Sequence, residues 1–143
     1  MAVRVQHHSG LVNWLSIGEL SVVSRSTTDN RQRVIEISRR EFTRLVEDAL
    51  NELPPRFADL LDNVVVVVEQ EPSEEDLDLL DDPDDELLGV FHNHPPLPDQ
   101  VVIFRGPILR TSRNRRDAIR EIRNTVMHEL GHYFGLDDEG MPY

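Results

Sequence analysis

The sequence contains no cysteine, no lysine and only one tryptophan among its 143 residues. Without cysteine the chain forms neither disulfide bonds nor thiolate metal sites, so nitrogen and oxygen atoms must bind any metal ion. It also lacks a long apolar run, because Asn13 and Glu19 interrupt the stretch 11–23, which is too short to span a bilayer. No basic segment or cleavage site of a secretion signal accompanies this stretch. We therefore expect a cytoplasmic protein without a membrane partner.

Basic residues are also few, and the acidic ones are unevenly distributed. The formal net charge is -12, and residues 62–86 contain 12 acidic side chains and no basic one. The rest of the chain holds 15 acidic residues and 15 arginines. Phosphate backbones repel such a domain, so we do not expect nucleic acid as a partner. The acidic segment 69–86 is predicted to be a solvated loop that can hold one helical turn.

The length suits one domain with one hydrophobic core. Apolar residues make up 38% of the chain and the mean hydropathy is -0.42, which is typical of a globular protein. Residues 1–34 show no clean hydrophobic period, and we expect an extension there, part of which can form a strand or hairpin at the domain edge. Residues 35–143 are predicted to form the domain itself.

Helix and strand signals begin at Ser38. Ser38 and Glu41 form a capping-box pattern, and apolar residues at helical spacing follow, which predicts a helix that ends near Leu53. Pro55 can open a further helical turn. Five consecutive valines, Val64 to Val68, predict a strand that is buried on both faces.

Two more strands are expected at residues 87–91 and 101–105, with a proline-rich loop over residues 92–99 between them. This loop contains His92 and His94. Histidines at this spacing share a face of a strand and can bind metal, but a proline-rich loop does not hold that geometry. We therefore expect a solvent-exposed pair or part of the rim of a cleft.

A long amphipathic helix is predicted from about Asn114 to Phe134. Its apolar stripe contains Ile119, Ile122, Val126, Leu130 and Phe134. At ~100° per residue, His128 and His132 point well away from that stripe. One face of the helix therefore packs on the core, and another presents the two histidines.

The sequence His-Glu-Leu-Gly-His at residues 128–132 has the pattern of a zinc-binding motif with a catalytic base. On a helix, His128 and His132 lie one turn apart on the same face and can bind one zinc ion. Glu129 can reach a water molecule on that zinc and accept its proton. The motif therefore predicts a metal site with His128 and His132 as ligands and Glu129 as the catalytic base.

The third ligand is expected just after this motif. Gly135 can end the helix and turn the chain back, which brings Asp138 toward the metal. Asp138 lies six residues past His132, which is the spacing of a longer zinc-peptidase motif, and a carboxylate is an acceptable zinc ligand. Asp137 is the main competitor, followed by Glu139. Because five residues follow Asp138, we do not expect a ligand from a second helix downstream.

Several blocks of sequence resemble a family of small bacterial zincin-like metallopeptidases over roughly residues 36–143. The blocks are Arg-Glu-Phe with Ala-Leu-Asn-Glu-Leu-Pro-Pro (within 40–55), Asp-Asn-Val-Val-Val-Val-Val-Glu (62–69), Leu-Leu-Gly-Val-Phe (87–91), Phe-Arg-Gly-Pro-Ile (104–108) and His-Glu-Leu-Gly-His-Tyr-Phe-Gly-Leu-Asp-Asp (128–138). The resemblance implies a minimal zincin, with a small, partly parallel sheet, helices on one side and the motif helix beside it. It also implies His128, His132 and Asp138 as zinc ligands and Glu129 as base. Members tend to have a more glycine-rich stretch where this chain has residues 92–98.

We therefore expect an α+β domain of zincin type, in which a small mixed sheet packs with helices that include the C-terminal motif helix. The expected function is that of a zinc metallopeptidase, which hydrolyses peptide or protein substrates through a metal-activated water with Glu129 as general base. Strand 87–91 or 101–105 is expected to pair with an extended substrate. The alternative is a catalytically inactive metal-binding module with an interaction or regulatory role. The presence of Glu129 argues against it, because such a site needs ligands and no base.

Overall fold

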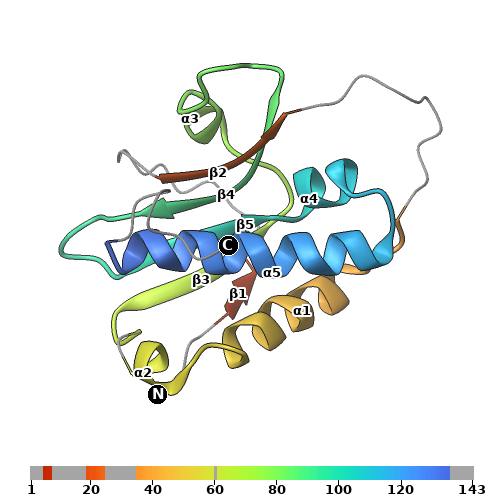
Figure 1. The fold of residues 1–143 in the computed structure, drawn as a ribbon. Helices are drawn as coiled ribbons and strands as arrows, with labels where there is room; N and C mark the ends of the chain where they lie inside the picture. Colours follow the sequence, from red (N-terminus) through yellow and green to blue (C-terminus); the bar gives the residue numbers. More distant parts are fainter. Residues whose placement is uncertain (1–4, 8–18, 25–34, 60, 136–143) are drawn as a thin grey trace.

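The computed structural model describes residues 5–7, 19–24, 35–59 and 61–135, and they form an α+β domain around one mixed sheet (Figure 1). The strands are β1 Val5–His7, β2 Glu19–Ser24, β3 Val64–Glu69, β4 Asp85–His92 and β5 Asp99–Phe104. Their order in space is β1-β3-β5-β4-β2. The first three in this order are parallel, and β4 is antiparallel to both of its neighbours. The predicted fold class, with a small mixed sheet, is confirmed.

Two long helices lie side by side across one face of this sheet (Figure 1). The helices in the described part of the chain are α1 Arg39–Asn51, α2 Pro55–Ala58, α3 Glu74–Leu77, α4 Arg105–Thr111 and α5 Arg115–Tyr133. The long pair is α1 and α5. None of the helices in this part combines the length and the apolar character that crossing a membrane requires.

The main hydrophobic core lies between the sheet and the two long helices. Alternate residues of the strands and one stripe of each helix fill it, including Val64, Val66, Val68, Val101, Ile103, Phe42, Val46, Ile122, Val126 and Leu130. Burying each of these side chains contributes about 1.5–3 kcal/mol. Two ion pairs also link the helices, Glu41 with Arg115 and Glu52 with Arg123. Their side chains are well exposed, and water screens such pairs so that they contribute little to stability. Apolar packing therefore holds α5 in place.

The helix and strand predictions hold, with small differences. The Ser38 hydroxyl accepts a hydrogen bond from the Glu41 backbone N–H at 3.2 Å and begins α1 as expected. The predicted stripe of α5 is wrong at Ile119, which is 38% exposed, and fully buried Ala118 takes its place in the core. The spacing of four residues along the stripe simply continues to 118. Strand β5 ends one residue before Arg105, where α4 begins.

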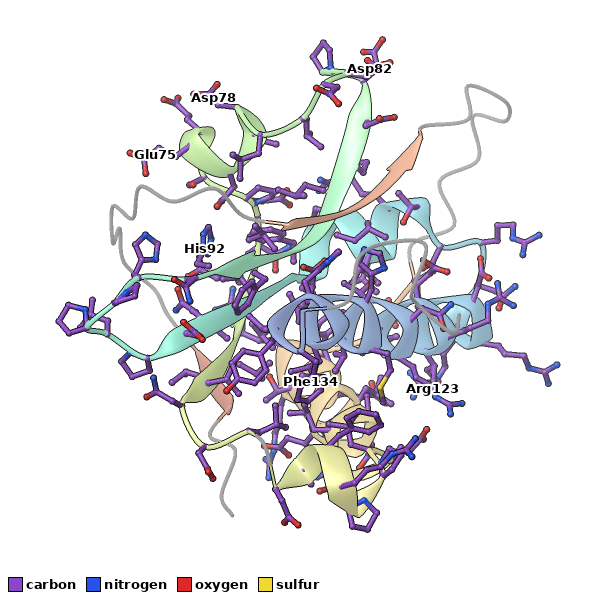
Figure 2. All side chains as sticks on the ribbon, turned by 60° about the vertical axis from the view of Figure 1, so that its left-hand side comes forward. Glu75, Asp78, Asp82, His92, Arg123 and Phe134 are labelled. Atoms are coloured by element: carbon purple, nitrogen blue, oxygen red, sulfur yellow. The ribbon has the colours of Figure 1, made fainter. Side chains whose placement is uncertain are left out.

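The acidic segment exposes many of its charged side chains to solvent and packs two of its leucines against the sheet. Figure 2 shows Glu75, Asp78 and Asp82 at the outside of the molecule, around α3 and the start of β4. Leu79 and Leu80 instead pack on a second, smaller apolar cluster on the sheet face opposite α5. That cluster contains Leu87, Val90, Val102 and Phe104. The expected helical turn is α3, and the packing of Leu79 and Leu80 just after it holds this segment against the sheet.

The strands β1 and β2 come from the predicted extension 1–34 and flank the described sheet on either side. The division of the chain at residues 34 and 35 stays a prediction. Strands β4 and β5 are interior, because each pairs with a strand on both sides. The expectation that residues 87–91 or 101–105 pair with an extended substrate is therefore wrong, since their backbone groups already have partners.

Helix α5 approaches the sheet closely at Gly89 of β4. A Cβ atom at this position would lie 2.8 Å from Thr125 Cγ2, 3.0 Å from the Val102 carbonyl oxygen and 3.1 Å from Glu129 Cγ. These distances are below ordinary van der Waals contact. The missing side chain therefore sets the depth at which α5 lies on the sheet.

We predict that Gly89→Ala lowers the free energy of unfolding by about 1–3 kcal/mol, because an added methyl group overpacks this contact. Urea unfolding measures the change. Thr125→Ser removes the nearest atom, so Gly89→Ala combined with Thr125→Ser should recover part of the loss, with Thr125→Ser alone as the control. A double variant no more stable than Gly89→Ala would contradict this account of the contact.

A carboxylate in the first turn of α5, Asp117, makes the stability of the fold depend on pH in the acidic range. Asn114 caps the helix by accepting from the Asp117 N–H at 3.0 Å. Hydrogen bonds from the Arg113 side chain and backbone, with the charge of Arg120 nearby, lower the pKa of Asp117 to about 2. The carboxylate is thus ionised over a wider pH range in the folded state than in the unfolded chain, where its pKa is about 3.9.

We predict that Asp117 stabilises the fold above about pH 4 and that this contribution disappears as the pH falls toward its folded pKa of about 2. The measurement is the unfolding free energy of the wild type and of Asp117→Asn across this range. Their difference should shrink as the pH falls. Asp81→Asn removes an exposed carboxylate of the acidic segment and is the matched control. A difference that stays constant with pH would contradict the prediction.

Candidate metal and catalytic site

The histidine motif lies in the last turns of α5. The helix ends at Tyr133, and Gly135 follows with a φ of 78°, in the left-handed region that favours glycine. The Gly135 N–H donates to the His132 carbonyl at 2.9 Å. The expectation that the helix ends at Gly135 is confirmed, and the helix end fixes the backbone directly after His132.

The two motif histidines turn their rings toward one another. Their Nε2 atoms are 2.9 Å apart, and the ring planes make an angle of 85°. His132 is 8% exposed and His128 is partly buried. Two nitrogens that bind one tetrahedral zinc at 2.0–2.1 Å are about 3.3 Å apart. The pair therefore suits a shared metal ion after a small adjustment of the side chains.

Glu129 lies between the helix and the sheet. Its side chain is fully buried, and its Cγ atom approaches the backbone of Gly89. Burying a carboxylate is costly, and the apolar contacts of α5 do not require one at this position. Buried ionisable groups that packing does not require are concentrated at functional sites.

Tyr133 follows the second histidine but has a structural setting. Its ring centroid lies 5.9 Å from that of Phe91 and 5.4 Å from that of Phe134. The Asn63 backbone N–H donates a hydrogen bond to its phenol oxygen. Burial, together with the negative charges of Asp99 and Asp62, raises the pKa of the phenol. Tyr133 therefore remains protonated at neutral pH and fastens the end of α5 to the sheet.

The expected third ligand, Asp138, lies outside the described residues, as do its competitors Asp137 and Glu139. Within residues 5–7, 19–24, 35–59 and 61–135, no three His, Asp or Glu side chains lie close enough to hold a metal ion. The described part of the site consists of His128, Glu129 and His132.

Sequence reasoning missed the contribution of Gly89 to this site. A glycine inside the apolar run Leu-Leu-Gly-Val-Phe is the available signal, since it often marks a place where another element approaches closely. The signal does not say which element approaches. Here it is the turn of α5 that carries Glu129.

The expectation that His92 and His94 form a solvent-exposed pair or part of the rim of a cleft is wrong for His92. This residue belongs to β4, is only 6% exposed and contacts Asp76 of α3 through its Nε2 atom at 3.1 Å. Side chains two residues apart on a strand share a face, so His92 points to the same side as Val90, opposite α5. His92 is therefore not part of the site on α5.

The fold and the motif agree with a comparison to known families. Residues 61–143 match the model of a family described as zincin-like metallopeptidase, which is more than half of the chain. No curated protein matches the chain. The matched region contains β3, β4, β5 and the whole of α5, that is, the centre of the sheet and the motif helix. The chain therefore belongs to the zincin-like metallopeptidase family.

Proposed function

We propose that this protein is a zinc-dependent peptidase that hydrolyses peptide bonds in peptides or proteins. The observation that carries the proposal is the convergence of His128 Nε2 and His132 Nε2, 2.9 Å apart, beside the buried Glu129. Two imidazoles and one carboxylate ligand, for which we propose Asp138, are a donor set that zinc accepts at catalytic sites. The family to which the chain belongs supports the same activity.

Each residue has one role in this proposal. His128 and His132 hold the zinc ion, and Asp138 completes the ligand set. When bound, zinc lowers the pKa of water and polarises a carbonyl oxygen. Glu129 accepts the proton from the attacking water and later donates it to the leaving amine. The packing of Glu129 against Gly89 fixes its backbone and Cγ, so the base is positioned before substrate binds.

We predict that Glu129→Gln retains zinc and loses peptide cleavage by roughly 100-fold or more, because the amide cannot accept the proton. Metal analysis gives the zinc content, and mass spectrometry of a peptide library gives the cleavage rate. His128→Gln with His132→Gln is the comparison variant, and it should lose zinc and cleavage together.

Two results would decide against the proposed roles. Cleavage that survives Glu129→Gln would show that Glu129 is not the base. Zinc bound by the wild type and by Glu129→Gln, with no cleavage of any peptide or protein by either, would favour the metal-binding module with an interaction or regulatory role. Thermal unfolding of each variant shows whether a loss of activity reflects a loss of fold.

We predict that Asp138→Ala lowers zinc affinity sharply, whereas Asp137→Ala leaves it nearly unchanged. The reason is that only one of the two neighbouring carboxylates acts as the third ligand, and the spacing from His132 favours Asp138. Competition with a chromogenic chelator measures the affinity of both variants. The reverse result would assign the ligand to Asp137, and no effect in either variant would leave Glu139→Ala as the deciding measurement.

A further inference from the structure

His92 presents a buried ring nitrogen on the sheet face opposite the motif helix. The residue is 6% exposed, and its Nδ1 atom has no hydrogen-bond partner among the described residues. A buried polar atom without a partner destabilises the fold, so its presence calls for an explanation. Neither the hydrophobic core nor the proposed peptidase site makes use of this atom.

The other ring nitrogen of His92 is held by a carboxylate. Asp76 Oδ1 lies 3.1 Å from His92 Nε2, and Asp76 Oδ2 accepts from the Ser73 hydroxyl at 2.7 Å and from the Ser73 N–H at 3.0 Å. Both hydrogen bonds from Ser73 favour the carboxylate form of Asp76.

The Asp76 carboxylate can only accept hydrogen bonds, so Nε2 of His92 carries the hydrogen in this contact. In the neutral ring, Nδ1 then keeps its lone pair. Histidines that bind metals typically have this arrangement, in which one nitrogen donates to a carboxylate and the other faces the metal. The contact between Asp76 and His92 thus prepares Nδ1 to act as a ligand.

A second imidazole lies beside the ring of His92. The ring centroids of His92 and His94 are 5.8 Å apart, and the ring planes make an angle of 43°. Two imidazoles that share one tetrahedral ion place their ring centres about 5 Å apart. The acidic side chains around α3, among them Glu75 and Asp78, also attract cations to this side of the molecule (Figure 2).

We propose that His92, through Nδ1, and His94 bind one divalent transition-metal ion of the class that prefers imidazole, such as Zn²⁺, Ni²⁺ or Cu²⁺. Water completes the coordination. The site is separate from the proposed peptidase site, because β4 directs His92 to the other face of the sheet from α5. It does not depend on the peptidase activity.

The first test counts zinc in the full chain after His128→Gln and His132→Gln have removed the other histidine pair. This variant should still bind one equivalent of zinc in isothermal titration, and adding His94→Gln should abolish that binding. Adding His7→Gln and His8→Gln instead is the matched control, because it removes the two histidines of the sequence that belong to neither pair, and it should leave the equivalent in place.

The second test asks which nitrogen binds and whether Asp76 prepares it. Long-range ¹H–¹⁵N spectra should show that zinc shifts the Nδ1 resonance of His92 while Nε2 stays protonated. Asp76→Asn should weaken zinc binding by roughly 10- to 100-fold. Asp78→Asn removes the same charge from the same segment and should change the affinity far less.

The proposal fails if the variant without His128 and His132 binds no zinc, or if His94→Gln leaves its binding intact. Coordination through Nε2, or equal effects of Asp76→Asn and Asp78→Asn, would also overturn it. These outcomes are independent of the peptidase proposal, which Glu129→Gln tests in the chain that retains all its histidines.

Discussion

The close contact between α5 and the sheet at Gly89 is the constraint on which the rest of the site depends. Because Gly89 has no side chain, the turn of α5 that carries Thr125 and Glu129 reaches the backbone of β4. The same contact fixes the rotation of α5 about its axis. Val126 and Leu130 then face the core, while the rings of His128 and His132 meet. Apolar burial provides the free energy, and one missing side chain determines the geometry.

Strand β4 serves both faces of the domain because its side chains alternate. Gly89 and Phe91 face α5 and its last residue, Tyr133, whereas Val90 and His92 face the acidic segment. The chain thus places its two histidine pairs on opposite sides of one interior strand. Each pair also has a carboxylate near it, the first in its own helix and the second in α3.

The features that could be predicted from the sequence are those with a local cause. Ser38, the valine run of β3 and the helical spacing along α5 act over a few neighbouring residues, and these elements form where expected. The role of Gly89 and the burial of His92 depend on residues far away in the sequence. No periodic pattern indicates that Asp76 covers His92, and the acidic composition of its segment favours a solvated loop. The geometry around His128 and His132 was predictable because both histidines lie on one helix.

The order of the strands has a consequence for how the protein folds during synthesis. Strands β1 and β2 leave the ribosome before the strands with which they pair, since β1 pairs with β3 and β2 with β4. The centre of the sheet, β3-β5-β4, must form before these two strands can join it at its sides. Non-local pairing of this kind slows folding and leaves strand edges open in the meantime. The strands β1 and β2 are therefore made before the centre of the sheet and incorporated after it.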